Sequence, residues 1–174
     1  LTVLGAWRMV LGGQPEETAP FVEIEEDRAR GVVFGRNTER PGYENAVAFV
    51  TGFAEVSTAV RPGRETVRST RAEVLSGTGK DLRAGREDFP SGGEDLPSAR
   101  DDETRQEMLR LAGFEELPAA ALRLTLTLPP RGEAVVWLVL GEGADRAEAE
   151  ALVGRFGTGA TADAELDEVR TFWT

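Results

Sequence analysis

Side chains able to do acid–base, nucleophilic or metal chemistry are limited in type along this chain. Its 174 residues include no His and no Cys, which excludes imidazole bases, thiol chemistry, disulfides and zinc sites built from these ligands. Catalysis would have to rest on carboxylates, Lys, Tyr, Ser or Thr. Adjacent acids such as Glu115–Glu116 are common, but glycosidic chemistry needs two carboxylates that face each other across a cleft. The sequence therefore predicts no catalytic residue, no metal ligand and no bound cofactor.

The stretch at 135–156, VVWLVLGEGADRAEAEALVGRF, has the order of a dinucleotide-binding unit: an apolar run, a glycine turn and a helical pattern. That motif requires three glycines, the last of which lets helix and strand pack closely. Gly141 and Gly143 are present, but Arg146 takes the third position, and Glu142 would put a negative charge beside a pyrophosphate. The stretch therefore predicts a strand that passes through a glycine turn into a helix, with no nucleotide bound.

The charge of the chain argues against a nucleic-acid partner. The formal net charge is −11. The residues that come closest to a basic stripe are Arg61, Arg64, Arg68 and Arg71, and they alternate with Glu65 and Glu73 as on a solvated strand. The chain contains no run of about 18 apolar residues, the length that a membrane-spanning helix needs. Its N-terminus also lacks the pattern of a secretory signal. We expect a cytoplasmic fragment of a longer protein, because the chain begins in a strand-like run without Met. Any membrane association would come from other parts of that protein.

Short strand-like runs joined by turns make up most of the chain. FVEIEE at 21–26 and ALRLTLTL at 121–128 alternate apolar with polar residues, which is the period of a half-buried strand, and Asp27 with Gly31 suits a tight hairpin. The run at 134–140 is apolar on both faces and predicts an interior strand covered on both sides. Since no helix separates most successive strands, the pattern predicts a mainly β fold, an antiparallel β-sandwich.

Composition divides the chain into three parts. Residues 1–142 carry the predicted sandwich, which is interrupted at about 77–114 by a segment rich in Gly, Pro and charge. We expect this segment to be a mobile polar insertion with a short helix at its end. Residues 143–174 carry two apolar stripes at helical spacing, the first capped by Asp145 with Glu148, and predict C-terminal linker helices.

Tryptophans are well suited to stacking on a sugar face because their rings are large and carry a polar edge. The chain has three, at positions 7, 137 and 173, each inside an apolar strand or on a helix stripe. We therefore predict that all three belong to the core, and that Trp7 is the best candidate if a sugar platform is present.

Several segments, taken in order, carry a resemblance to a known family. LTVLGAWRMVLGG is similar to a family strand, APFVEIEEDRARGVVFGRN to a hairpin that ends in Arg-Asn, here Arg36–Asn37, and RSTRAEVLSG to a segment whose arginine falls at Arg71. PPRGEAVVWLVLGEG is similar to the last strand. Together they resemble the N-terminal supersandwich domain of glycoside hydrolase family 94, formerly glycosyltransferase family 36. The resemblance implies a supersandwich of the galactose-mutarotase-like kind.

That family includes cellobiose and chitobiose phosphorylases and the C-terminal part of cyclic β-1,2-glucan synthases. Its sandwich precedes an (α/α)6 barrel, where phosphate attacks a β-glucoside with inversion while an acid of the barrel protonates the departing sugar. The resemblance thus implies an accessory domain without a catalytic acid, which packs on its own (α/α)6 domain, contributes to a homodimer and lies near a β-linked glucan or oligosaccharide. Inorganic phosphate is then a co-substrate of the parent enzyme if that enzyme is a phosphorylase.

Three departures from the family pattern bear on the branch. Arg8–Met9 stands where an acidic residue and an aromatic are usual, the loop at 12–20 is short, and Leu117 replaces an Asp before Pro118. These changes favour the cyclic-glucan-synthase branch, or a divergent relative, over a disaccharide phosphorylase.

Five residues are the candidates for contacts near the carbohydrate: Arg36, Asn37, Arg71, Glu73 and Trp7. Arginine forks and carboxylates bind hydroxyl groups through paired hydrogen bonds, but the same charged residues also suit ion pairs along strand surfaces. Two other functions stay open. One is an autonomous carbohydrate-binding module, and the other is a protein-interaction sandwich without catalysis, for which a large exposed apolar patch would be the sign.

Overall fold

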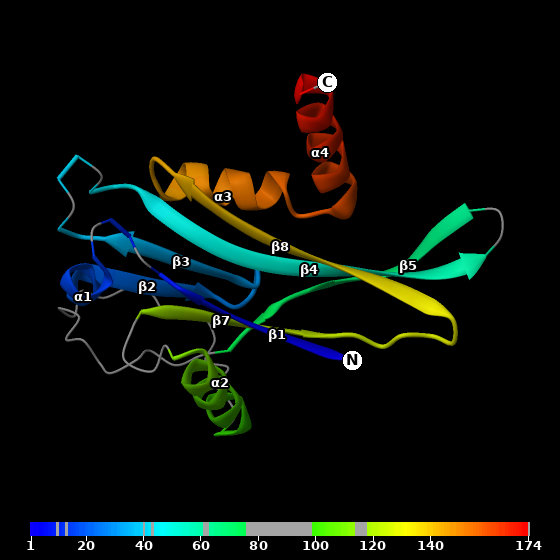
Figure 1. Ribbon diagram of the computed structural model, residues 1–174, viewed down its shortest axis with the longest axis horizontal. Helices are drawn as coiled ribbons and strands as arrows, with labels where there is room; N and C mark the ends of the chain where they lie inside the picture. Colours follow the sequence, from blue (N-terminus) through cyan, green and yellow to red (C-terminus); the bar gives the residue numbers. More distant parts are fainter. Residues whose placement is uncertain are drawn as a thin grey trace.

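The computed structural model describes two antiparallel β-sheets with helices on their outer faces (Figure 1). Most of the predicted insertion at 77–114 lies outside the described residues, as do Glu115, Glu116 and Leu117. The described residues are 1–9, 11–12, 14–39, 41–42, 44–60, 63–75, 99–113 and 118–173.

The larger sheet is built around one long strand. Its five strands are β2 (Val22–Asp27), β3 (Val32–Asn37), β4 (Val47–Val60), β5 (Gly63–Arg71) and β8 (Gly132–Gly143). β8 pairs with one edge of β4 over its whole length, and β3 and β5 share the other edge of β4. The β2–β3 hairpin is the one that Asp27 and Gly31 predict, because the Asp27 carboxylate accepts the Arg30 backbone N–H at 2.9 Å.

The smaller sheet has the strand order β1–β7–β6, with bounds Thr2–Arg8, Ala119–Thr125 and Glu73–Val74. The chain leaves the larger sheet for the smaller one at Ala72, whose N–H donates to the Gly52 carbonyl at 2.7 Å. Every strand pair among the described residues is antiparallel. The predicted mainly β, antiparallel sandwich is therefore confirmed.

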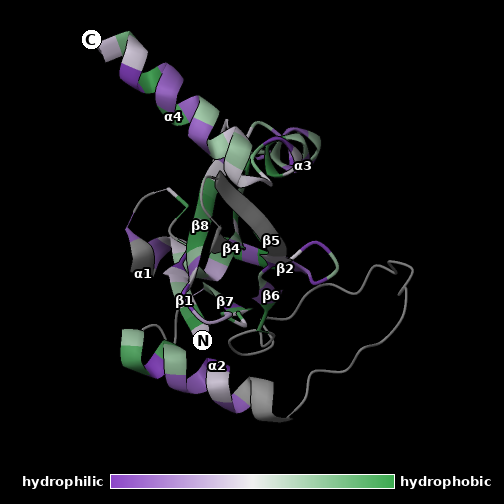
Figure 2. Cartoon of the chain, turned by 90° about the vertical axis from the view of Figure 1, so that its right-hand side faces the viewer, coloured by the Kyte–Doolittle hydropathy of each residue, from purple (hydrophilic) through white to green (hydrophobic). Residues whose placement is uncertain are grey.

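Helices cover the outer face of each sheet. Seen from the side, α3, the larger sheet, the smaller sheet and α2 follow one another as layers, while α4 extends away from the body (Figure 2). Glu148 N–H donates to the Asp145 carboxylate at 2.9 Å, as the predicted cap of α3 requires. The helices are α1 (Pro15–Thr18), the 3-10 helix η1 (Ala19–Phe21), α2 (Ala99–Ala112), α3 (Arg146–Arg155) and α4 (Gly159–Trp173).

Three apolar clusters hold these layers together. Leu122 of β7 lies in the cluster between the sheets, Phe34 of β3 in the one beneath α3, and Met108 of α2 in the one against the smaller sheet. The alternation predicted for 121–128 holds as far as Leu126, because Leu124 and Leu126 are buried while Thr125 and Thr127 are exposed. It fails at Leu128, which follows the strand and is 41% exposed.

The prediction that the run at 134–140 is an interior strand is wrong. β8 pairs with β4 and with no other strand among the described residues, and Leu138 and Leu140 are 47% and 60% exposed. One face of β8 does lie beneath α3, where Val139 packs. An apolar run on both faces predicts which faces avoid water, but it carries no information on whether the strand's edge is paired.

The tryptophans divide between half-buried and exposed positions. Trp7 and Trp137 are half-buried, and the Trp137 ring stacks on Phe53 with centroids 6.2 Å apart. The core prediction fails for Trp173, which is 79% exposed on α4. The helical stripe that contains Trp173 is real, but the described residues place no apolar surface over it.

A network of ion pairs fixes α3 to the β2–β3 hairpin. Arg30 donates to Glu150 at 2.8 Å and also contacts Asp27, while Arg146 donates to Glu150 at 2.8 Å and to Glu25 at 2.7 Å. The hydrogen bonds from Arg30 and then Arg146 lower the pKa of Glu150 to about 2. Residues 120 positions apart in sequence are thus joined through one shared carboxylate.

We expect this network to make the stability of the domain depend on pH, with stability lost in acid. A carboxyl whose pKa is lowered by folding stabilises the fold above its unfolded pKa, about 4.5 here, and the contribution is lost as pH falls toward 2. Tm, followed by circular dichroism, should therefore fall between pH 4.5 and 2, and Glu150→Gln should show a lower Tm at pH 7 and a smaller fall. Because Glu150 is 36% exposed, added salt should reduce the difference. An equal fall in both proteins would contradict the assignment.

Candidate functional site

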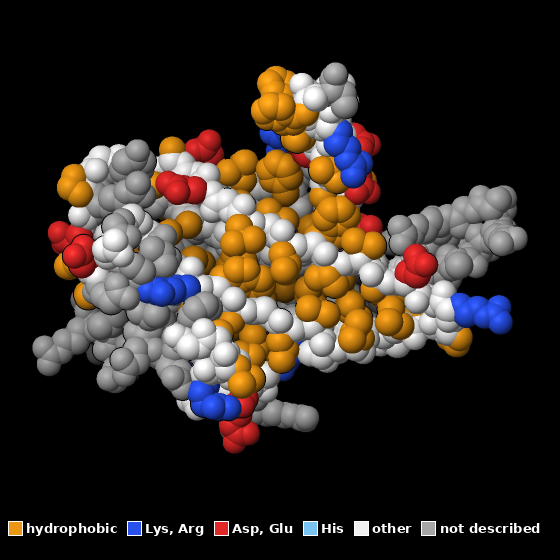
Figure 3. Space-filling view, in the orientation of Figure 1, with side chains coloured by type: hydrophobic (Ala, Val, Ile, Leu, Met, Phe, Trp, Pro, Cys, Tyr) orange, Lys and Arg blue, Asp and Glu red, His pale blue; other side chains and the backbone are white. Residues whose placement is uncertain are grey.

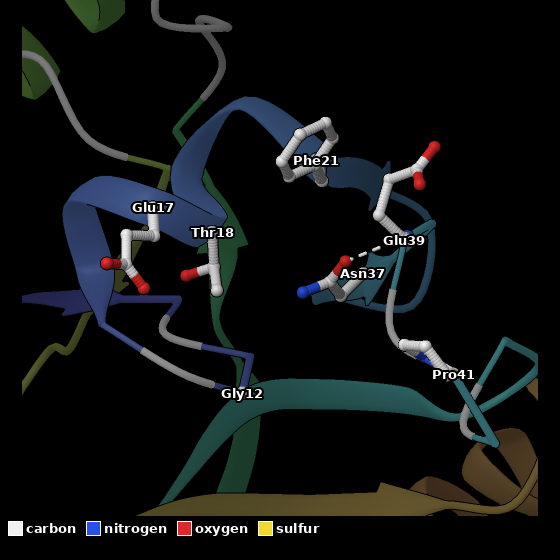
Figure 4. A pocket seen from close by; sticks show the side chains of 7 residues that line it. All are labelled: Gly12, Glu17, Thr18, Phe21, Asn37, Glu39 and Pro41. Atoms are coloured by element: carbon white, nitrogen blue, oxygen red, sulfur yellow. Dashed lines mark hydrogen bonds between the residues drawn. The ribbon is translucent and has the colours of Figure 1, made fainter.

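A shallow hollow in the surface lies where the loop after β1 meets the end of β3. It has a volume of about 350 Å³ and opens to solvent beside α1 and η1 (Figure 4). Polar and apolar side chains share its wall, which is typical of a small-molecule site. The lining residues are Gly12, Glu17, Thr18, Phe21, Asn37, Glu39 and Pro41.

Asn37 lines this hollow and ties the loop after β1 to the end of β3. The side chain is buried, with 7% of the residue exposed. Its Nδ2 donates to the Leu11 carbonyl at 2.6 Å, and its Oδ1 accepts the Glu39 backbone N–H at 2.9 Å. Since an amide NH2 has two hydrogens, one donor remains beyond the Leu11 bond when only the described residues are considered. Asn37 thus builds the pocket and keeps some capacity to bind a hydroxyl group.

We expect Asn37→Ala to destabilise the domain by about 1–3 kcal/mol, because it leaves the Leu11 carbonyl and the Glu39 N–H without their partner. Urea unfolding followed by tryptophan fluorescence measures the loss. Asn45→Ala, at an exposed position on the β3–β4 connection, is the matched control. If the two variants unfold at the same urea concentration, Asn37 does not organise the pocket.

The rim of the hollow combines one aromatic ring with two acids. Phe21, at the end of η1, is 42% exposed, and its ring stands over the opening (Figure 4). Glu17 and Glu39 are exposed on opposite sides. An exposed ring can stack on the apolar face of a sugar, and carboxylates accept hydrogen bonds from its hydroxyl groups. The same carboxylates repel phosphate and other anions, so the rim favours a neutral ligand.

The structure brings the predicted site residue Asn37 into this hollow but leaves Arg36 outside it. The Arg36 side chain lies on the face of β3 opposite to that of Asn37, because successive residues of a strand point to opposite faces. It pairs with Glu23 of the neighbouring strand β2 at 2.6 Å. Glu73 pairs in the same way with Arg123 at 2.8 Å, on the smaller sheet. For Arg36 and Glu73 the alternative weighed from sequence, an ion pair along a strand surface, is what the geometry shows.

Arg71 and Trp7 lie in two further places. Arg71 ends β5, and its guanidinium approaches the joint between α3 and α4, where a Cβ built on Gly157 would lie 3.5 Å from Nη2. Trp7 packs its ring over Gly5 on the inner side of β1. The five candidates therefore do not form one site, and a role in carbohydrate contact stays a prediction for each of them.

Sequence reasoning missed the rim of the hollow. α1 is only four residues long, and by its resemblance to the family the segment from 12 to 20 is expected to be a short loop. The signal that could have found it is Pro15 followed by acids, a common helix start. In the part of the chain that the structure describes, no group of three or more acidic side chains could hold a metal ion. Nor does a described helix combine the length and apolarity needed to cross a membrane.

Comparison with known proteins gives one finding. The family model described as "Glycosyl hydrolase 94, supersandwich domain" matches residues 1–158. Comparisons with curated proteins and with solved structures give no significant match. The matched range covers both sheets, the hollow and α3, and ends at residue 158, directly before α4 begins at Gly159.

Proposed function

Because the chain belongs to the glycosyl hydrolase 94 supersandwich domain family, we propose that it is an accessory domain of a carbohydrate-active enzyme resembling β-glucan phosphorylases and cyclic β-1,2-glucan synthases. The family match over residues 1–158 is the observation that carries the proposal. Bond cleavage is then the task of a separate catalytic (α/α)6 domain, and the sandwich supports that domain and lies near its glucan.

The exposed apolar stripe of α4 supports a packed neighbour. α4 leaves the body of the sandwich (Figure 1), and a helix that is apolar along one side normally buries that side against protein. We assign this stripe to the contact with the catalytic domain. Its members are Leu166, Val169, Phe172 and Trp173, which are 44–79% exposed.

The direction of α4 is set by contacts with the sandwich. The Gly159 N–H, at the start of α4, donates to the Glu55 carboxylate of β4 at 2.9 Å. Arg155, at the end of α3, forms an ion pair with Glu165 one turn and a half into α4. A helix start favours a carboxylate, so these contacts present the stripe at a defined angle to the sheets.

The hollow at Asn37 is the part of the domain best suited to contact glucan. The Phe21 ring and the free amide donor fit a neutral sugar, whereas the acids at the rim oppose phosphate. If the parent enzyme is a phosphorylase, its inorganic phosphate therefore binds in the catalytic domain. The proposal also includes a homodimer, a cytoplasmic location and no nucleic-acid partner, the last because of the net charge of −11.

The test is phosphorolysis of β-1,2- and β-1,4-linked glucans by this chain alone, measured as release of glucose 1-phosphate. We expect no turnover, because the catalytic acid lies in another domain. Measurable turnover that survives repurification would overturn the proposal.

An autonomous carbohydrate-binding module is the second candidate, and the exposed Phe21 ring beside the hollow favours it. Calorimetric titration of β-1,2- and β-1,4-linked oligoglucosides into the chain separates the two. Submillimolar affinity that Phe21→Ala abolishes supports the module, whereas absence of binding supports a domain that contacts glucan only together with its catalytic partner.

A further inference from the structure

The turn between α3 and α4 lies on two charged side chains of the larger sheet. A joint of three residues, 156–158, links the two helices, and it lies against Glu55 of β4 and Arg71 of β5. Arg71 stands opposite Phe53, which is two residues from Glu55 along β4. Since alternate residues of a strand share a face, both charged side chains lie on the outer face of the sheet.

Glu55 meets the first residue of α4. Its carboxylate accepts the Gly159 N–H at 2.9 Å, one of the four backbone N–H groups that a helix start leaves without a partner inside the helix. The Thr158 hydroxyl accepts a second, the Thr161 N–H, at 3.3 Å. The partial positive charge of a helix start also favours a carboxylate. α4 therefore takes one of its caps from a central strand of the sheet and not from its own segment.

Arg71 lies at the end of α3, where the partial charge of the helix has the opposite sign. A Cβ built on Gly157 would lie 3.5 Å from Arg71 Nη2 and 3.3 Å from the Val153 carbonyl oxygen, which belongs to the last turn of α3. The guanidinium and the carbonyl end of the helix thus meet at one glycine, and a cation is stabilising near a helix C-terminus. The sheet presents a positive group to the end of α3 and a negative group to the start of α4.

Glycine at position 159 lets the Glu55 carboxylate approach the helix start closely. Gly159 is buried, and a Cβ built there would lie 2.6 Å from Glu55 Oε2 and 2.8 Å from Oε1. These distances are well inside van der Waals contact, so alanine would force the carboxylate or the helix start to move and would break their hydrogen bond. At Gly154 of α3, by contrast, a built Cβ meets nothing within 4 Å.

The other contacts that could hold α4 are weaker. Arg155 and Glu165 form an ion pair, but the Arg155 side chain is mostly exposed, and exposed pairs contribute little. None of the three apolar clusters of the described residues includes a residue after Val153. α4 accordingly projects from the body, with apolar side chains at its far end (Figure 3). Its direction therefore depends on the contacts at the joint.

We propose that Glu55 and Arg71 form a socket, matched in charge to the two helix ends, that receives the joint and fixes the direction of α4. They are positioning residues, which hold the apolar stripe of α4 at one angle to the sandwich. That the stripe meets a catalytic domain rests on the proposed function, whereas the socket itself does not. The socket also gives Arg71 a task that needs no carbohydrate.

The test measures the direction of α4 by pulsed electron–electron double resonance. Because the chain has no cysteine, Thr125→Cys on β7 and Glu168→Cys on α4, both at exposed positions, carry the only two spin labels. We expect one narrow distance peak when the socket is intact. Glu55→Ala, Gly159→Ala and Arg71→Met should each lose this peak and give a broad distribution. A broad distribution with the socket intact, or a narrow peak kept by any of the three variants, overturns the proposal.

Control variants separate the direction of α4 from the stability of the sandwich. Glu55→Gln keeps an acceptor oxygen for the Gly159 N–H and should keep the narrow peak. Gly154→Ala adds a Cβ in open space and Arg155→Gln removes the exposed ion pair, and both should keep it as well.

The Tm of Glu55→Ala should stay close to that of the wild type, because the apolar clusters hold the sandwich without α4. Broadening by Arg155→Gln as large as that by Glu55→Ala, or a broad distribution that appears only with a large fall in Tm, would overturn the proposal. Since the measurement uses this chain alone, its outcome is independent of the phosphorolysis test of the proposed function.

Discussion

Gly31→Ala is expected to destabilise the domain by about 2–5 kcal/mol. Gly31 sits in the β2–β3 hairpin with φ of +66°, a left-handed conformation that costs a residue with a Cβ about 1–2 kcal/mol. A Cβ built there would lie 2.1 Å from the Ala72 carbonyl oxygen. Both groups belong to well-anchored backbone, because the Gly31 carbonyl accepts the Thr51 hydroxyl at 2.8 Å and the Ala72 N–H is bonded to Gly52. Relief of the clash adds about 1–3 kcal/mol.

Gly42→Ala separates the two contributions. Gly42 has φ of +81°, but a Cβ built there meets nothing within 4 Å. We expect it to lose only the conformational part, about 1–2 kcal/mol. In a protein of this size each kcal/mol lowers Tm by about 2–4 °C, so scanning calorimetry resolves the difference. Equal Tm values for the two variants would show that the hairpin and the Ala72 crossover are not packed as closely as described.

The fold could be predicted to the extent that it follows from local patterns. Alternation at 121–128 predicts the inner face of β7, Asp27 with Gly31 predicts the hairpin, and Asp145 with Glu148 predicts the start of α3, all of which the structure contains. The open edge of β8 and the exposed stripe of α4 could not be predicted. Hydrophobic periodicity reports which side chains avoid water, whereas pairing and covering depend on contacts distant in sequence.

The candidate site shows the same division. Asn37 is found from the family resemblance, but its partner Leu11 lies 26 residues away, so no local pattern indicates that it builds a pocket. Arg36 and Glu73 become members of cross-strand ion pairs only once the strand register places Glu23 and Arg123 opposite them. An arginine in a strand is equally suited to a ligand or to an ion pair until that register is known.

Phe34→Ala is expected to cost about 3–5 kcal/mol, among the largest losses for a single side chain in this domain. Phe34 is 1% exposed and lies in the cluster between β3, β4 and α3, which includes Ala149 and Val153. The Arg146 guanidinium stacks over its ring, 3.5 Å from the centroid. Removing the ring leaves a cavity and also takes away the surface on which Arg146 rests, so the ion-pair network should weaken with it.

Phe34→Leu separates the apolar volume of the Phe34 ring from its cation–π contact, and Phe21→Ala is the control for loss of an exposed ring. Leucine keeps most of the apolar volume but not the cation–π contact, and should cost about 1–2 kcal/mol. Phe21→Ala, at the exposed rim of the hollow, should cost less than about 1 kcal/mol. Urea unfolding ranks the three, and amide exchange in α3 should be faster in Phe34→Ala than in Phe34→Leu. Because α3 leads directly into α4, loosening α3 would also release the angle at which the α4 stripe is presented. If Phe34→Ala costs no more than Phe21→Ala, α3 is not held by its packing on the larger sheet.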